Sequence, residues 1–222
     1  MSFEFSKPAD WTFTAGQFID ITLTNPPETD KEGDKRGFSI SSAPYEATIM
    51  ITTRMRDTAF KRVLNTMPLE AEVTIEGPFG DLILHDDATR PAVLLTGGVG
   101  VTTFRSIVLQ AAHLKRSHRI VMFYSNRRPE DAAFLTELQA LQKTYPNYTL
   151  VATMTGMERS KEYWSGETGK IDASMLAKYA VVTGNALFYI TGPPKMVRGL
   201  RAMLAAMGVG ADDILTEEYS GY

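Results

Sequence analysis

The chain has 222 residues, enough for one large domain or two small ones, and 44% of them are hydrophobic, which is sufficient for a buried core. A formal net charge of −3 argues against a protein whose main task is to bind nucleic-acid phosphates. The lack of cysteine excludes disulfides, thiolate metal ligands and iron–sulfur clusters on these residues, and three scattered histidines predict no metal site.

Neither a membrane span nor an export signal is expected. No apolar run approaches the ~20 residues that cross a bilayer. The N-terminal segment MSFEFSKPAD lacks the basic and apolar regions of a signal peptide. We therefore expect a cytoplasmic protein.

Charge divides the chain into two unlike parts. Residues 1–90 hold 9 basic and 15 acidic side chains, a balance of −6, whereas residues 91–222 hold 14 and 11, a balance of +3. Such asymmetry indicates two domains with different ligands. We place the junction within Asp86–Arg90 and the domains at residues 1–88 and 89–222.

The first part is expected to consist of short strands. Gln17–Thr24 alternates polar and apolar residues, and Thr48–Thr53 and Glu70–Glu76 behave similarly. Turn-rich segments separate them, including one at Gly77–Gly80, and a short helix is expected at Ala59–Asn65. This rhythm predicts a small antiparallel barrel or sandwich.

Strands and helices alternate in the second part, which predicts a parallel sheet with helices on both faces. Helices are expected after Thr103, from Pro129 with Phe134, Leu138 and Leu141 on one side, and from Pro194 to Met207. The expected strands are Ala92–Thr96, Arg119–Tyr124, Thr149–Met154, Leu187–Thr191 and Ile214–Tyr219.

Two segments have the composition of a nucleotide site. Leu94–Ser106 (LLTGGVGVTTFRS) runs from an apolar strand through a glycine-rich turn into a helix, whose N-terminus attracts phosphate. Its spacing is not G-x-G-x-x-G, so a tight turn without a ligand is the alternative. Arg36–Pro44 (RGFSISSAP) offers an arginine for phosphate, a ring to cover a planar group and a hydroxyl, although a surface arginine beside a core strand has the same pattern.

Two further segments end strands near the chain's C-terminus. Tyr189–Val197 (YITGPPKMV) turns sharply at Gly192–Pro194, at the edge of the sheet where open α/β folds bind ligands. Glu217–Tyr222 (EEYSGY) offers aromatic rings that could cover a planar ligand. A plain strand–helix connection and a frayed polar tail are the respective alternatives.

Together, and in this order, these segments resemble the ferredoxin–NADP reductase superfamily over essentially the whole chain. Ala15–Gln17 is similar to the family's AGQ segment, Arg36–Ser39 to R-x-Y-S, and Gly77–Gly80 to G-P-x-G. Leu95–Thr102 is similar to G-G-x-G-I-T, and Gly192–Met196 to C-G-P-x-x-M. The resemblance implies a Greek-key flavin-binding barrel followed by an NAD(P)H-binding α/β domain with a C-terminal aromatic tail.

The resemblance also implies a flavin site. Arg36 would bind a phosphate of FAD, Phe38 would stack on the isoalloxazine, and Ser39 would hydrogen-bond near flavin N5, the atom that accepts hydride. FAD is preferred over FMN, although the G-x-x-S motif that the family often has on the pyrophosphate is not clear in Thr58–Lys61. The other residues implied on the flavin are Gly37, Thr52, Thr53, Arg54, Thr58, Lys61 and either Tyr219 or Tyr222.

A second set of residues would hold NAD(P)H. Ser125, Arg127 and Arg128 follow an expected strand that has no acidic residue at its end, which favours NADPH over NADH; the alternative is a solvated turn. The remaining members of this set are Thr96, Gly97, Gly98, Gly100, Val101, Thr102, Gly192, Pro193 and Met196.

Three departures from the family pattern concern the proposed chemistry. Thr191 stands where the family has cysteine beside the nicotinamide, Phe38 replaces tyrosine, and the tail continues past Tyr219. Ser39, Glu217 and Thr191 are the candidate catalytic residues.

These features predict an enzyme that passes hydride from NAD(P)H to a bound flavin, and electrons on to a separate redox protein or a small molecule. The alternatives are a non-catalytic flavin-binding subunit of a redox complex and a nucleotide-binding module without flavin.

Overall fold

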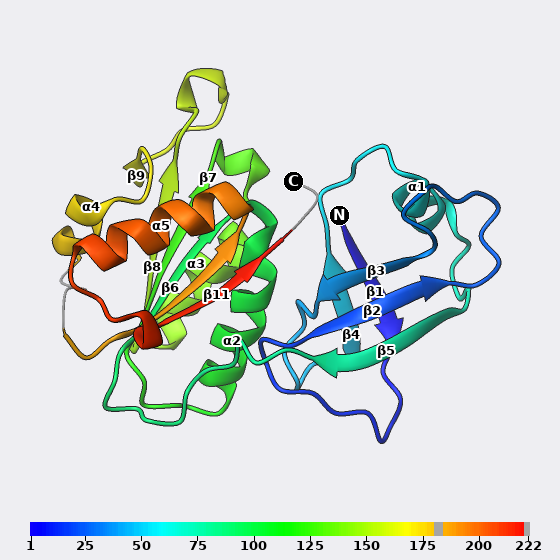
Figure 1. Cartoon of the computed structure of the whole chain (residues 1–222), viewed down its shortest axis with the longest axis horizontal. Coiled ribbons are helices and arrows are strands. Elements are labelled where there is room, and N and C mark those ends of the chain that lie inside the picture. Colours follow the sequence, from blue (N-terminus) through cyan, green and yellow to red (C-terminus); the bar gives the residue numbers. More distant parts are fainter. Residues whose placement is uncertain (180–183, 220–222) are drawn as a thin grey trace.

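The computed structural model describes residues 1–179 and 184–219 and contains two parts that lie side by side (Figure 1). The first, residues 1–79, is called here the antiparallel part. It consists of β1 (Ser2–Ser6), β2 (Phe18–Leu23), β3 (Lys35–Ser39), β4 (Thr48–Thr52), α1 (Ala59–Thr66) and β5 (Val73–Phe79).

Strands of the antiparallel part form two small sheets around one core. β1 pairs with β4, and β2 lies between β3 and β5, with an isolated bridge from Ile40 to Ile51 between the sheets. The apolar residues Ile19, Ile21 and Leu23 of β2 are buried, as their period of two predicts. They pack against Phe60 and its neighbours on α1.

The second part is a six-stranded sheet in the order β11-β10-β6-β7-β8-β9, in which every neighbouring pair is parallel. Its strands are β6 (Ala92–Gly97), β7 (Ile120–Asn126), β8 (Tyr148–Met154), β9 (Glu167–Thr168), β10 (Leu187–Gly192) and β11 (Ile214–Glu218). Its helices are α2 (Val101–His113), α3 (Leu135–Thr144), α4 (Ala173–Lys178) and α5 (Pro194–Ala206).

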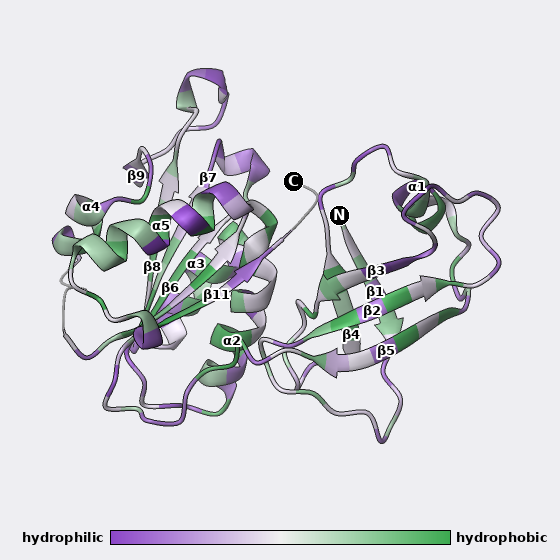
Figure 2. Ribbon diagram, viewed as in Figure 1, coloured by the Kyte–Doolittle hydropathy of each residue, from purple (hydrophilic) through white to green (hydrophobic). Residues whose placement is uncertain are grey.

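Alternate residues of the central strands point to opposite faces of this sheet. Leu94 and its even-numbered neighbours pack against α2 and α3, whereas Val93 and Leu95 pack against α4 and α5. Both faces are covered, so the central strands are buried along most of their length, and their first residues are hydrophobic (Figure 2). The predicted order of an antiparallel part followed by a parallel sheet is confirmed, whereas the domain boundary at residue 88 stays a prediction.

The strand order reverses between β6 and β10. After β6 the chain adds β7, β8 and β9 on one side, then returns to place β10 and β11 on the other. The turns after β6 and β10 therefore lie next to each other at the carboxyl edge of the sheet. This switch point is where open α/β sheets bind ligands.

Three sequence predictions need correction. The helix expected from Pro129 is interrupted, because Phe134 adopts a left-handed backbone conformation (φ 59°) and α3 begins only at Leu135. The strand expected at Glu70–Glu76 runs instead from Val73 to Phe79. It therefore includes most of the turn expected at Gly77–Gly80, and its pairing with β2 shifts in register between Phe18 and Asp20. Leu114, which the apolar spacing of Phe104, Ile107, Val108, Ala111 and Leu114 predicts on the buried face of the helix after Thr103, is 51% exposed because α2 ends at His113.

Helix α2 joins the two parts through a buried arginine. The Arg105 guanidinium donates to the Ser41 carbonyl at 2.7 Å, to both carboxylate oxygens of Glu46 and to both of Glu137, and it lies over the Phe134 ring. Ser106 adds a hydrogen bond to the Ser42 carbonyl. These contacts fix α2 against the antiparallel part.

No helix in residues 1–179 and 184–219 has the length and apolar content that a membrane crossing requires.

Arg105→Ala is expected to lower the free energy of unfolding by about 2–3 kcal/mol, because two carboxylates lose their shared buried partner while remaining partly exposed to water. Chemical denaturation measures the change. Arg198→Ala, at an exposed position on α5, serves as the control and should change stability by less than about 0.5 kcal/mol. Equal losses in the two variants would contradict the assigned role of Arg105.

Candidate functional site

A cavity of about 440 Å³ lies between the antiparallel part and the start of α2. We call it the cationic cavity. Most of its wall comes from β3, the end of β4 and the start of α1, and Tyr219 closes it from the C-terminal side. The lining residues are Glu32, Arg36, Gly37, Phe38, Ser39, Thr52, Thr53, Arg54, Arg56, Thr58, Phe60, Lys61, Val99, Thr102 and Tyr219.

Positive charge gathers at one end of this cavity. Arg36, Arg54, Arg56 and Lys61 line it with a single carboxylate, Glu32. Among the described residues no ion pair involves Arg54, Arg56 or Lys61. Burial and the repulsion of Arg56 and Arg36 lower the pKa of Lys61. This end of the cavity therefore favours an anion.

Aromatic rings and hydroxyl groups occupy the rest of the cavity. Phe38 and Phe60 lie with ring centroids 5.8 Å apart. Ser39, Thr52 and Thr53 are buried residues of the lining, and their hydroxyl groups are hydrogen-bonded within the protein: Ser39 to Tyr219, Thr52 with Ser2 and Ser41, and Thr53 to the Arg54 carbonyl. The combination suits a ligand with a planar ring, a polyhydroxyl chain and a phosphate.

A hydrogen-bonded chain connects the cavity to β11. The Ser39 hydroxyl donates to the Tyr219 hydroxyl at 2.8 Å, and Tyr219 donates to Oε2 of Glu217 at 3.0 Å. Thr103 on α2 also hydrogen-bonds to the Tyr219 hydroxyl. Burial and the nearby Glu217 carboxylate raise the pKa of Tyr219, so its proton stays in place.

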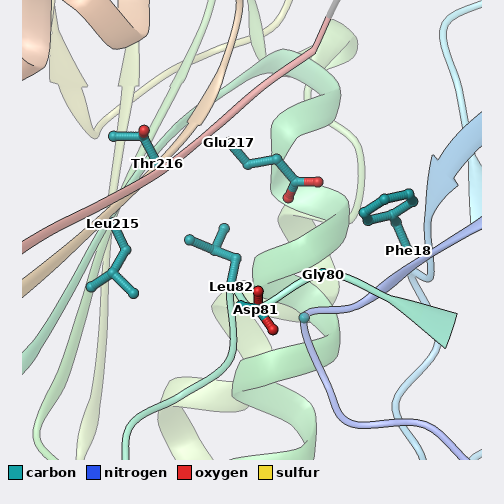
Figure 3. Close-up of a pocket in the computed structure, with 8 residues that line it drawn as sticks. Phe18, Gly80, Asp81, Leu82, Leu215, Thr216 and Glu217 are labelled. Atoms are coloured by element: carbon teal, nitrogen blue, oxygen red, sulfur yellow. The ribbon is translucent and has the colours of Figure 1, made fainter.

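Glu217, the last residue of this hydrogen-bonded chain, also lines a neighbouring hollow. A second hollow of about 390 Å³, the β11 hollow, is lined by Gly16, Phe18, Gly80, Asp81, Leu82, Leu215, Thr216 and Glu217. Figure 3 shows Glu217 and Phe18 approaching each other across it from β11 and β2. Burial raises the pKa of Glu217, although the hydrogen bond from Tyr219 opposes the shift.

The glycine-rich turn after β6 packs tightly on the turn after β10. A Cβ at Gly100 would lie 2.8 Å from Thr96 Oγ1 and 3.0 Å from the Thr191 carbonyl, and one at Gly97 would lie 2.6 Å from Met196 Sδ. Gly98 adopts a positive φ of 56°. The glycines therefore allow the two turns to meet at the switch point.

Thr191 does not reach the cationic cavity. It is fully buried, and its hydroxyl donates to Thr96 Oγ1 and to the Gly100 carbonyl, both at 2.9 Å. The strand register aligns Thr191 with Thr96 on one side and Glu217 on the other. In this structure its hydroxyl holds the two turns together.

The turn after β7 distinguishes its two arginines. Arg128 is held by Asp131 through two hydrogen bonds of 2.8 and 2.9 Å, with Glu130 also near. Arg127 is exposed, and no ion pair in the described part of the chain includes it. Ser125 on β7 pairs with Gly97 on β6, so it lies beside the glycine-rich turn.

The sequence-predicted site residues thus form two groups. Most of the predicted flavin residues line one cavity, together with Thr102 of the predicted NAD(P)H set. The turn residues Thr96, Gly97, Gly98, Gly100, Val101, Ser125, Gly192, Pro193 and Met196 gather instead at the carboxyl edge of the sheet. Tyr222 lies outside the described residues.

Several cavity residues escaped the sequence analysis. Phe60 and Glu32 line the cavity without any motif to mark them, and Val99 lies within the glycine-rich segment but was not singled out. Arg56 stands two residues after Arg54, and this basic pair could have been recognised as one edge of an anion site.

Comparisons with known proteins agree with this architecture. Residues 94–202 match the family model described as "Oxidoreductase NAD-binding domain". The reductase component 1 of terephthalate 1,2-dioxygenase from Comamonas sp is 23% identical over 94% of this chain and 60% of its own length. The glycine betaine monooxygenase reductase subunit from Chromohalobacter salexigens is 26% identical over 93% of this chain and 56% of its own length. The chain thus spans about 60% or less of these curated relatives.

Solved structures share the fold over nearly the whole chain. A ferredoxin NADP⁺ reductase from Neisseria gonorrhoeae with bound FAD and NADP has a TM-score of 0.79 at 24% identity, covering 98% of this chain and 91% of that one. The flavohem-like FAD/NAD-binding domain of a nitric oxide dioxygenase from Vibrio cholerae has a TM-score of 0.81 at 20% identity, covering 99% and 92%. The resemblance expected from the motifs is confirmed: residues 94–202 match an oxidoreductase NAD-binding domain, and the chain shares its fold with a ferredoxin NADP⁺ reductase over nearly its whole length.

Proposed function

We propose that this protein is a flavin-dependent oxidoreductase that takes hydride from NAD(P)H and passes electrons to an acceptor outside these 222 residues. The observation that carries the proposal is the cationic cavity, where rings, hydroxyls and unpaired cations share one space beside the switch point. Its volume lies within the ~300–1,000 Å³ typical of cofactor sites.

The residues of the cavity fit a phosphorylated flavin. Phe38 and Tyr219 would lie against the planar ring system, and Thr52 and Thr53 would face the ribityl hydroxyls. The cations at the α1 end would bind phosphate. Their number favours FAD, with its pyrophosphate, over FMN.

A bound flavin would supply the redox chemistry, since it accepts a hydride and releases electrons singly or in pairs. Ser39 would donate a hydrogen bond to the ring edge once Tyr219 releases it. Tyr219 would keep its hydrogen bond to Glu217, which lines the β11 hollow. The raised pKa of Glu217 suits a group that holds or releases a proton there.

The nicotinamide coenzyme would bind at the switch point. The N-terminal end of α2 and the turn at Gly192–Pro193 face the same edge of the sheet. Arg127 is the better candidate for a 2′-phosphate than Arg128, because Asp131 already neutralises Arg128. We therefore propose NADPH as the preferred coenzyme.

The acceptor is proposed from the relatives. Two of them are named as reductase components of a dioxygenase and a monooxygenase. The present 222 residues contain no cysteine, so they hold no iron–sulfur ligand. Electrons would pass from the flavin to a separate redox protein or to a small molecule.

One observation favours a second candidate, a flavin-binding subunit without NAD(P)H turnover. Thr191, which stands in place of the family's cysteine, has its hydroxyl committed to Thr96 and Gly100. It therefore leaves no free side-chain hydroxyl at that position to contact a nicotinamide.

Anaerobic mixing with NADPH or NADH tests the proposal directly. The purified yellow protein is expected to lose its flavin absorption within seconds with at least one coenzyme. Bound flavin that neither coenzyme bleaches would favour the non-catalytic subunit. A protein that stays colourless after incubation with FAD and with FMN would overturn both.

Arg127→Ala is expected to raise the KM for NADPH by about tenfold, the effect of one lost charge-assisted hydrogen bond, while the KM for NADH changes little. Arg128→Ala is the matched control and should have a smaller effect, because that guanidinium is already paired. Steady-state kinetics with both coenzymes measures the difference. Equal changes for NADPH and NADH would remove Arg127 from the coenzyme site.

Glu217→Gln is expected to stabilise the protein at pH 7. The raised pKa of Glu217 means that its ionised form is disfavoured in the folded state, so stability is lost as pH rises above the group's ordinary value of 4.5. Glutamine avoids that loss, and its advantage should vanish as pH falls below 4.5. Thermal unfolding at a series of pH values measures the difference in stability, with Glu218→Gln, at an exposed neighbouring position, as control. A gain from Glu217→Gln that does not change with pH would contradict the burial of an ionised carboxylate.

A further inference from the structure

An internal carboxylate accepts hydrogen bonds from Arg36, which lines the cationic cavity, and from the first backbone N–H of α1. Asp30 lies in the loop before β3. Its Oδ2 accepts a hydrogen bond of 3.2 Å from the backbone N–H of Ala59, the first residue of α1. Its Oδ1 accepts one of 3.1 Å from the Arg36 guanidinium.

These two donors are the ones that a phosphate would use. A guanidinium and the backbone N–H groups of a helix N-terminus form the commonest protein site for a phosphoryl oxygen. Asp30 therefore presents two oxygens where a phosphate would present two of its own.

The surrounding contacts hold the loop over α1. Glu28 makes a two-point ion pair with Arg62 of α1, with distances of 2.9 and 2.6 Å. Arg36 also donates to the carbonyls of Glu32 and Lys35 and lies 3.1 Å from the Glu32 carboxylate. A hydrogen bond from the backbone of Glu32 is the main reason that the pKa of Asp30 is lowered, so its carboxylate is charged at neutral pH.

The contrast with the other cations is the decisive feature. Arg54, Arg56 and Lys61 line the same cavity and form none of the ion pairs found in the described residues. Arg36 alone among the four is neutralised, and it is neutralised by a loop fastened to α1. Arg54, Arg56 and Lys61 are thus available to an anion, whereas Arg36 is already paired with Asp30 and Glu32.

We propose that Asp30 is a built-in competitor for the flavin phosphate, which lowers the affinity of this protein for FMN and FAD but not for riboflavin. A phosphorylated flavin gains Arg36 and the α1 N-terminus only when Asp30 leaves them. The inference rests on the proposed flavin site. Flavin affinity would then depend on the loop that carries Asp30 as well as on the residues that line the cavity.

Equilibrium titration of the flavin-free protein with riboflavin, FMN and FAD, followed by flavin fluorescence, tests the inference without measuring activity. Asp30→Asn keeps the shape of the side chain and removes its charge. This variant is expected to bind FMN and FAD at least about tenfold more tightly than the wild type, corresponding to one competing charge-assisted contact, with riboflavin unchanged.

Two further variants make the result specific. Asp34→Asn removes the same charge from the same loop, at a side chain that forms no ion pair within the described residues, and should leave all three affinities unchanged. In an Arg36→Ala background the gain from Asp30→Asn should shrink, because only the Ala59 N–H remains of the two contested donors. If Asp30→Asn fails to fold, Asp30→Ser replaces it, since serine still accepts from a helix N-terminal N–H.

The outcomes separate the two levels of the proposal. Weaker or unchanged binding of FMN and FAD by the Asp30 variants would overturn the inference and indicate that Asp30 positions Arg36 for phosphate. Tighter binding of riboflavin to the same extent would also overturn it, since riboflavin has no phosphate. If no flavin binds to the wild type or any variant, the proposed function falls as well.

Discussion

Unpaired positive charge in one cavity is the constraint on which this account depends. The first 90 residues carry a net negative charge, yet three of their nine basic side chains, Arg54, Arg56 and Lys61, line one cavity and form no ion pair with the residues that the structure describes. Arg54 and Arg56 are exposed to solvent, whereas burial and neighbouring cations lower the pKa of Lys61. A bound phosphate would neutralise this charge, so the lining is more consistent with an anionic ligand than with a neutral one.

The second requirement is that the cavity remain aligned with the parallel sheet. Arg105 and Ser106 fix α2 to the antiparallel part, and the same helix begins at the glycine-rich turn. The hydrogen bonds from Ser39 through Tyr219 to Glu217 cross the same boundary. A ring bound in the cavity and a coenzyme bound at the switch point would therefore be positioned by one rigid helix, which is what hydride transfer between them requires.

Local sequence patterns predicted the elements that depend on residues close together in the sequence. The alternation in β2 predicted that strand, and the glycines after β6 predicted the turn. The cavity wall was predicted from Arg36–Ser39 and from the family resemblance. Contacts between distant segments were beyond such patterns. Arg105 meets Glu46 across 59 residues, and Ser39 meets Tyr219 across 180. The break at Phe134 also went unpredicted, because no glycine or asparagine marks its left-handed backbone.

A crystal structure of the protein grown with FAD tests the central claim most directly. The account predicts electron density for a tricyclic ring beside Phe38 and Ser39, with phosphate density at Arg54, Arg56 and Lys61. A cavity closed by the protein's own side chains, or a flavin bound elsewhere on the surface, would contradict it.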